Sequence, residues 1–205
     1  MARKSTRGAG VRAQIAAAAA RLMAEDGIED FALAKRKAAR QVGATVRDGL
    51  PGNEEVEAEL RAYRALYQED EHPERIAELR RLALEVMRVL ERFHPYLTGA
   101  VLAGLAGPYA EIELQLFPES TKELEIFLLD RNIPFATREA RRFSGDRARA
   151  VSVFTLDWHG VPLRLVVFDP RDERVAVKTS VAGRVAERAG IAELAALVRR
   201  SDAAI

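Results

Sequence analysis

The sequence predicts an α+β protein in which N-terminal helices precede a mixed sheet with flanking helices. Up to Phe93, apolar residues recur at helical spacing in successive segments. After His94-Pro95 the pattern changes to short apolar runs separated by glycines. Two of these runs, 151–158 and 161–168, alternate apolar and polar residues around His159-Gly160, which is typical of a β-hairpin. These observations indicate that helices fill the first half of the chain and strands dominate the second.

The first half predicts four helices, each with a recognisable end. We expect them at residues 11–25, 31–42, 53–67 and 74–93. Asp26-Gly27 ends the first, Asn53 caps the third, and Pro73 stands at the first turn of the fourth. The predicted organisation is a disordered basic tail at 1–10, a helical region at 11–70 and an α+β core at 71–205.

The second half predicts short strands and two further helices. We expect strands at 100–103, 111–117 and 133–137, besides the hairpin. Ser120 or Thr121 caps a helix that runs to about residue 131. The arginine-rich segment 138–150 is expected to be an exposed excursion, and residues 182–200 a closing amphipathic helix interrupted at Gly190.

Composition excludes several classes of site. The chain has no cysteine, which excludes disulfides, zinc-thiolate sites and thiol catalysis. The apolar run 15–20 is too short to span a membrane, so we expect a soluble, cytoplasmic protein with no membrane partner. Residues 1–49 and 135–205 carry net charges of +5 and +4, whereas 50–91 and 92–134 carry −5 and −3. This segregation permits an anionic partner at either end, or docking of the ends on the middle. It does not indicate an oligomeric state.

Glu111 and Glu113 form the most informative polar pair. They point to the same side of the strand predicted at 111–117, because side chains alternate along a strand. Two acids in this arrangement repel each other unless a cation lies between them. They could hold magnesium for phosphate transfer, or they could be the polar face of a half-exposed sheet.

The order of elements around this pair resembles the core of the nucleotidyltransferase fold, the superfamily of polymerase beta-like enzymes. A helix leads to an apolar run ending in Ala103-Gly104-Leu105, then to the Gly107-Pro108 turn and the strand with Glu111-Ile112-Glu113. The resemblance covers roughly residues 75–169. It implies that Glu111 and Glu113 are catalytic and hold magnesium, that Gly104 and Gly107 allow backbone contact with a nucleotide phosphate, and that Arg164 or a loop arginine steadies a triphosphate.

Two features distinguish this chain from an active member of that superfamily. Leu105 stands where a small or hydroxyl residue would let the backbone contact phosphate. Arg164 occupies the middle of the later strand, where a third acid would be expected. We therefore expect a degenerate member that binds a nucleotide or phosphate-bearing ligand with weak or no transferase activity. Magnesium is a cofactor only if the acidic pair is functional.

Residues 12–44 contain a predicted helix, an acidic-glycine turn after Met23, and a second helix that ends in Ala38-Ala39-Arg40-Gln41-Val42-Gly43. This stretch resembles the start of a TetR-type helix-turn-helix domain. Gly49, Pro51 and Gly52 oppose the recognition helix that should follow Gly43, so sequence-specific DNA binding is not expected.

A cluster of basic residues remains on the second predicted helix: Lys35, Arg36, Lys37 and Arg40. These residues could bind the backbone of RNA or DNA, or they could pair with the acidic segments 54–59 and 69–71. The arginines at 138–149 are a weaker signal of the same kind. The alternative function is a noncatalytic nucleic-acid-binding or protein-interaction module.

Overall fold

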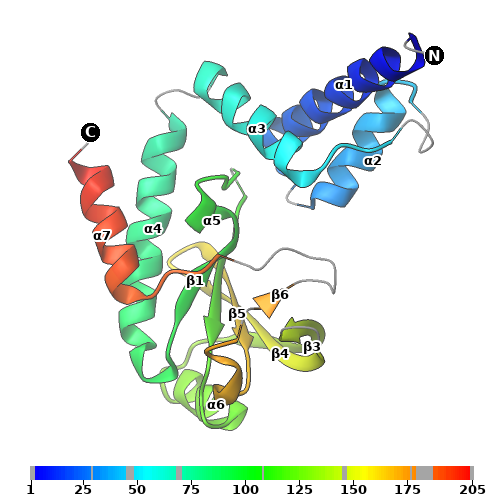
Figure 1. Ribbon diagram of the computed structural model, residues 1–205. Helices are drawn as coiled ribbons and strands as arrows, with labels where there is room; N and C mark the ends of the chain where they lie inside the picture. Colours follow the sequence, from blue (N-terminus) through cyan, green and yellow to red (C-terminus); the bar gives the residue numbers. More distant parts are fainter. Residues whose placement is uncertain are drawn as a thin grey trace. The chain divides into compact units, whose positions relative to one another are not determined.

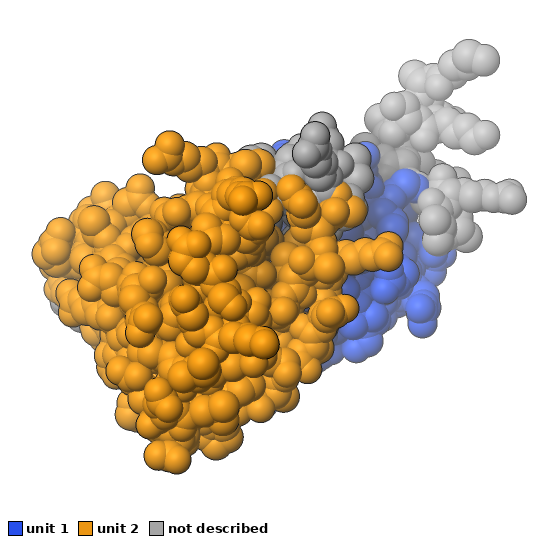
Figure 2. Space-filling view, turned by 90° about the horizontal axis from the view of Figure 1, so that it is seen from below, with its two compact units in different colours: residues 1–75, 105–110 blue, residues 76–104, 111–205 orange. Residues whose placement is uncertain are grey.

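The computed structural model describes residues 3–28, 30–44, 49–67, 71–107, 109–144, 147–175, 177–178 and 187–203. The chain divides into two compact units, which Figure 2 colours separately. The helical unit comprises residues 1–75 and 105–110, and the α+β unit comprises 76–104 and 111–205. The first boundary between the units follows Arg75. The assignment of 105–110 to the helical unit was not expected from the sequence.

The helical unit contains α1 (Arg3–Glu25), α2 (Phe31–Gln41) and α3 (Asn53–Tyr67). Small side chains make up most of its core, which lets the helices pack closely. The buried residues of the three helices include Ile15, Ala16, Ala19, Ala20, Ala34, Ala38, Ala39, Val56 and Leu60. Asp30 starts α2, because its side chain accepts hydrogen bonds from the backbone N–H of Ala32 and of Leu33.

The N-terminal helix is longer than the sequence predicts. It begins at Arg3, so residues 3–10, which we expected in a disordered tail, are helical. Extending a nucleated helix gains one hydrogen bond for each residue fixed, and the alanine-rich segment that follows supplies the nucleus. The bounds of α2 and α3 agree with the prediction to within one residue.

The chain enters the sheet through α4 (Glu71–Val89), the 3-10 helix η2 (Glu91–Phe93) and strand β1 (Tyr96–Thr98) (Figure 1). The strand predicted at 100–103 is wrong, because these residues lie in helix α5 (Gly99–Ala103). A short apolar run does not distinguish a strand from a buried helical turn. Gly99 has a φ of +74°, a left-handed conformation that favours glycine and turns the chain from β1 into α5.

Among the described residues, six strands form the mixed sheet that organises the α+β unit. The remaining strands are β2 (Ile112–Leu116), β3 (Phe135–Ser144), β4 (Arg147–Trp158), β5 (Val161–Val167) and β6 (Val177–Lys178). The order across the sheet is β1-β2-β5-β4-β3-β6. The pair β2 and β5 is parallel and the other neighbours are antiparallel. The α+β class is therefore confirmed, as is the hairpin of β4 and β5 around His159-Gly160.

The arginine-rich segment 138–150 is not the exposed loop that the sequence predicts. It belongs to the long hairpin of β3 and β4, which are paired from Phe135 opposite Leu156 to Ser144 opposite Arg147. Charged residues mask the strand signal in β3, whereas Val151 and Val153 of β4 are buried and hold the hairpin on the sheet.

Two helices complete the α+β unit. Helix α6 (Thr121–Asp130) begins at Ser120, whose side chain accepts a hydrogen bond from Lys122 N–H at 3.2 Å. Helix α7 (Ile191–Asp202) follows Gly190 and runs beside α4, where Arg81 donates to Asp202 at 2.7 Å. The 3-10 helix η3 (Pro170–Asp172) follows β5. Residues 182–186 of the expected closing helix lie outside the described residues.

The sheet has two chemically different faces at β2. Ile112, Leu114 and Leu116 are fully buried on one face. Glu113 and Gln115 point to the other face, as strand alternation requires. That second face also carries an apolar cluster of Phe117, Val151, Val153, Val166 and Phe168. The acidic pair thus lies beside a packed surface and not on a strand face that is fully open to water.

Candidate functional site

Three neighbouring strands bring the candidate site together. Thr98 of β1 is the register partner of Glu113 of β2, and Glu113 is the register partner of Arg164 of β5. Register partners on adjacent strands project to the same side of the sheet. Thr98, Glu113 and Arg164 therefore form one row across three strands. Glu111 lies two residues before Glu113 and projects to the same side.

Arg164 forms ion pairs with both predicted metal ligands. One guanidinium nitrogen, Nη2, pairs with Glu111 Oε1, and the other, Nη1, donates to Glu113 Oε2 at 3.0 Å. The hydroxyl of Thr98 donates to Glu113 Oε1 at 3.2 Å. The side chains of Glu111, Glu113 and Arg164 are 20%, 26% and 26% exposed, respectively. Because these charges are largely removed from water, the ion pairs are stronger than surface pairs.

This arrangement does not fit a magnesium site. The guanidinium of Arg164 contacts both carboxylates, and a divalent cation would need those same oxygen atoms. Among the described residues, no group of three or more His, Cys, Asp or Glu side chains could hold a metal ion. The arrangement can instead neutralise the mutual repulsion of Glu111 and Glu113 and hold them in one orientation.

The glycine beside this pair is Gly99 and not the predicted Gly104. A Cβ atom on Gly99 would lie 3.7 Å from the Cβ of Glu113, so the backbone at the end of β1 runs directly beside the acidic strand. Gly104 ends helix α5 with a φ of +71°. Arg80 donates to the carbonyl oxygens of Val101 at 3.1 Å and Leu102 at 2.7 Å near the end of that helix. The sequence does not select Gly99, because a short apolar run such as 100–103 is compatible with a strand as well as with a helical turn.

Gly107, the other predicted phosphate-contacting glycine, belongs to the helical unit. Residues 105–110 group with that unit, whereas Glu111 and Glu113 belong to the α+β unit. The polar neighbours of Gly107 are the guanidinium of Arg64 and the carbonyl oxygen of Met23. Sequence reasoning did not select Arg64, although it continues the apolar stripe of Val56 and Leu60 at four-residue spacing.

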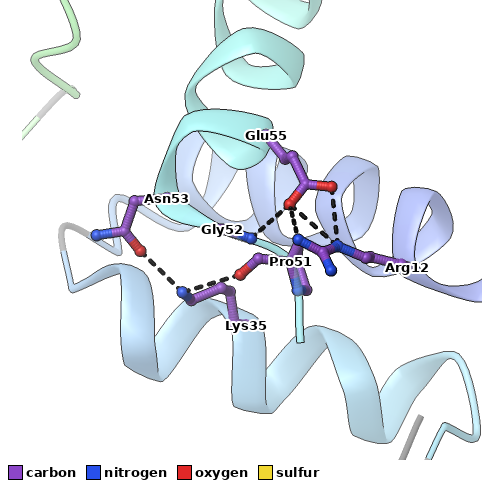
Figure 3. A network of polar contacts seen from close by, with 6 residues as sticks. All are labelled: Arg12, Lys35, Pro51, Gly52, Asn53 and Glu55. Atoms are coloured by element: carbon purple, nitrogen blue, oxygen red, sulfur yellow. Dashed lines mark hydrogen bonds and ion pairs between the residues drawn. The ribbon is translucent and has the colours of Figure 1, made fainter. Parts of the chain in front are cut away.

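The basic cluster of α2 is partly engaged within the helical unit. Lys35 donates to the carbonyl oxygen of Pro51 at 3.1 Å and to the side-chain oxygen of Asn53 at 2.8 Å (Figure 3). Lys37 lies 3.8 Å from Asp26. Arg36 and Arg40 are exposed. Two of the four predicted nucleic-acid contacts therefore have partners inside the unit, so the cluster is a smaller cationic surface than the sequence suggests.

Figure 3 also shows the polar contacts of Glu55, in the acidic first turn of α3. Glu55 accepts from Arg12 of α1 at 2.6 Å and from the backbone N–H of Gly52 at 2.6 Å. The Arg12 guanidinium is the main cause that lowers the pKa of Glu55, followed by the Gly52 N–H. This pair ties α1 to α3, which is a structural role.

The arginines of the β3–β4 hairpin lie on defined strand faces. Arg142 and Arg149 are register partners and so share one face. Arg138 lies on the same face, four residues before Arg142. Asp172 Oδ2 is 3.8 Å from Arg149 Nε. We call Arg138, Arg142 and Arg149 the basic arm face.

A shallow hollow of about 450 Å³ lies elsewhere in the α+β unit, lined by Glu119, Asp169, Pro170 and Arg171. Glu119 and Asp169 follow the carboxyl ends of the parallel strands β2 and β5, whereas Glu111 precedes β2. The five residues of β2 span roughly 16 Å. The hollow is therefore separate from the Glu111–Arg164–Glu113 cluster, and it adds no ligand to it.

Comparison of the chain with protein-family models, with curated proteins and with solved structures gives no match. Within the described residues, every helix is too short or too polar to cross a lipid bilayer. The functional argument therefore rests on the geometry of the chain itself.

Proposed function

We propose that the α+β unit is a nucleotidyltransferase-like domain that binds a nucleotide or another phosphate-bearing ligand and has weak or no transferase activity. The observation that carries this proposal is the position of Arg164. It stands beside Glu113 on the neighbouring parallel strand, where the superfamily pattern calls for a third acid, and it pairs with both carboxylates.

The glycine geometry supports the resemblance in a form that differs from the sequence motif. The superfamily pattern has a strand that ends in glycine followed by a small or hydroxyl residue. With β1 at 96–98, this position corresponds to Gly99-Ala100 and not to Gly104-Leu105. Ala100 is small, so the objection raised by Leu105 does not apply to the observed strand end. Glu111 directly precedes β2 and Glu113 lies on it, and β2 is the antiparallel neighbour of β1.

We expect the α+β unit to have little or none of the transferase activity of the superfamily. Magnesium would need Arg164 to leave both carboxylates, because the ion would coordinate the same oxygen atoms that now pair with the guanidinium. A guanidinium supplies positive charge and hydrogen-bond donors. Unlike Mg²⁺, it has no coordination positions through which it could bind a phosphate oxygen and protein oxygens together. The role left for the α+β unit is ligand binding without metal.

Thermal unfolding in the presence of each of the four nucleoside triphosphates, with and without Mg²⁺, tests this proposal. We expect a rise in Tm that does not require Mg²⁺, and the same rise in the Glu111→Gln, Glu113→Gln variant. Glu119→Gln is the matched control, since Glu119 is an acid of the same unit outside the cluster. A rise that requires Mg²⁺ and disappears in the double variant would indicate a working metal site. No rise with any triphosphate would reject nucleotide binding.

A second candidate function is binding of RNA or DNA through the basic arm face. The supporting observation is the direct pairing of Arg142 with Arg149 across the hairpin. Like charges directly opposite each other on a sheet destabilise it, and a phosphodiester backbone between them would relieve the repulsion. Contacts of this kind are independent of sequence.

The salt dependence of binding tests this second candidate. Replacing both Arg138 and Arg142 with alanine should weaken binding to RNA or DNA and lower the slope of log affinity against log salt by about one for each lost phosphate contact. Arg171→Ala is the control, because Arg171 is exposed and lies outside the hairpin. Binding with the same affinity and salt slope in the double variant would rule out the basic arm face as the contact surface.

A further inference from the structure

Helix α3 places one charged side chain in the core stripe of the helical unit. Val56, Leu60 and Arg64 follow at four-residue spacing, so they lie on the same side of the helix. Val56 and Leu60 are fully buried, and Arg64 is only 4% exposed. A long cationic side chain normally reaches solvent with its charged end, and Arg64 does not.

The guanidinium of Arg64 is buried and has no counter-charge among the described residues. Its Nε and Nη1 atoms have no hydrogen-bond partner, and no carboxylate among the described residues forms an ion pair with it. Burial lowers the pKa of Arg64 to about 10, so the group is still charged at neutral pH. A buried charge of this kind is expensive unless it is paired, and an unsatisfied buried group in a native fold indicates a missing partner.

The surroundings of Arg64 leave room beside one of its nitrogens. A methyl group added to Gly107 would lie 3.8 Å from Arg64 Nη2, from Gly27 Cα and from the carbonyl oxygen of Met23. These are ordinary van der Waals distances, so a space of about one methyl group exists there. The carbonyl oxygen of Met23, in the last turn of α1, borders the same space, and Nε and Nη1 of Arg64 have no hydrogen-bond partner.

His72 lies close enough to respond to Arg64. Its Nε2 is 3.1 Å from the carbonyl oxygen of Ala106, which connects α4 to the loop containing Gly107. Burial lowers the pKa of His72, and the charge of Arg64 lowers it further. The pKa of His72 therefore responds to a change in the net charge at Arg64.

We propose that Arg64 and the backbone around Gly107 form a binding site for a small phosphate-type oxyanion, with one of its oxygens in the space beside Arg64 Nη2. The planar guanidinium presents paired donors that match the oxygens of phosphate. Gly107 leaves the space that a side chain would fill beside Arg64 Nη2, whereas a side chain at Gly27 would meet the ring of Tyr109 at 2.9 Å. This site lies in the helical unit and does not depend on the function proposed for the α+β unit.

The test uses the full chain and inorganic phosphate, with sodium chloride of equal ionic strength as the reference. Phosphate should raise Tm, and it should raise the pKa of His72 measured by NMR, because an anion cancels the repulsion from Arg64. Arg64→Met and Gly107→Ala should each weaken phosphate binding by about tenfold or more, since charge-assisted hydrogen bonds are lost or blocked. Arg61→Met, an exposed arginine of the same helix, should bind phosphate as the wild type does.

The outcomes separate this proposal from its competitors. Gly107→Ala keeps the charge of Arg64 and fills only the space beside it, so this variant remains informative if Arg64→Met fails to fold.

A free phosphate ion and the phosphate of a nucleotide are distinguished by titrating AMP and adenosine. Tighter binding of AMP than of phosphate, with no effect of adenosine, identifies a nucleotide phosphate. The proposal is overturned if phosphate changes neither Tm nor the His72 pKa. It is equally overturned if both changes persist in Arg64→Met and Gly107→Ala.

Discussion

Replacing Arg164 with alanine should destabilise the protein through the two carboxylates that Arg164 neutralises. Glu111 and Glu113 are two residues apart on one strand, a separation of roughly 6.6 Å. At an effective dielectric constant near 20, two negative charges at that distance repel by about 2.5 kcal/mol. The charges are about one quarter exposed, so water screens part of this repulsion, while the loss of two ion pairs adds to it. We expect a net loss of about 2–3 kcal/mol at pH 7.

Thermal or urea unfolding measures this loss. For a chain of this size it corresponds to a fall in Tm of about 5–10 °C. Arg138→Ala, an exposed arginine on β3 of the same unit, is the control and should change stability little. The variant Glu111→Gln, Glu113→Gln, Arg164→Met removes all three charges and should recover most of the loss, because no charge is left unpaired.

The pH dependence of the Arg164→Ala variant gives a second and stricter test. Without Arg164, the repulsion acts only while both glutamates are ionised, so the deficit is present at neutral pH and shrinks as acidification protonates either carboxylate. An Arg164→Ala variant as stable as the control, or one whose deficit grows on acidification, would refute the assignment of Arg164 as the neutralising cation.

Three further predictions concern single features of the fold. Gly99→Ala should cost about 1 kcal/mol in urea unfolding, because Gly99 has a φ of +74°, whereas Gly10→Ala in α1 should be neutral or stabilising. Lowering the pH through the unfolded value for histidine, about 6.5, should destabilise the protein, since burial and Arg64 depress the His72 pKa when the chain is folded; His72→Gln should flatten this part of the stability-pH curve. Arg142→Ala should raise stability by a few tenths of a kcal/mol at low salt through loss of its repulsion with Arg149, and less at high salt; an equal effect at both salt concentrations would contradict that reason.

Much of the fold could be predicted because its signals are local. The spacing of apolar residues and the caps at Asp30 and Ser120 act within one or two turns of a helix, and the hairpin turn at His159-Gly160 acts between adjacent strands. The start of β1 could not be predicted in the same way, since three strand residues followed by a five-residue helix leave no repeated pattern. The long hairpin was missed because β3 is stabilised by its partner β4 and not by its own composition.

Some features of the candidate site also follow from local sequence patterns, whereas others depend on long-range pairing. That Glu111 and Glu113 share a strand face follows from alternation within one strand. That Arg164 stands beside Glu113 depends on the register of two strands that are 51 residues apart in sequence, which no local pattern encodes. Arg64 is an intermediate case: its position in the stripe of Val56 and Leu60 is visible in the sequence, but a lone arginine in such a stripe usually extends its charge to solvent.

The two charge clusters differ in what they still lack. Glu111, Glu113 and Arg164 carry a net charge of −1, and both carboxylates have cationic or hydroxyl partners, so this cluster has little to gain from a metal ion. Arg64 carries +1, and its buried Nε and Nη1 have no partner among the described residues, so an anion that fits beside it would stabilise the helical unit. If the chain binds a phosphate-bearing ligand, the negative charge of the phosphate is therefore more favourable beside Arg64 than beside the acidic strand. Phosphate binding that survives in Glu111→Gln, Glu113→Gln but is lost in Arg64→Met would place the ligand contact there.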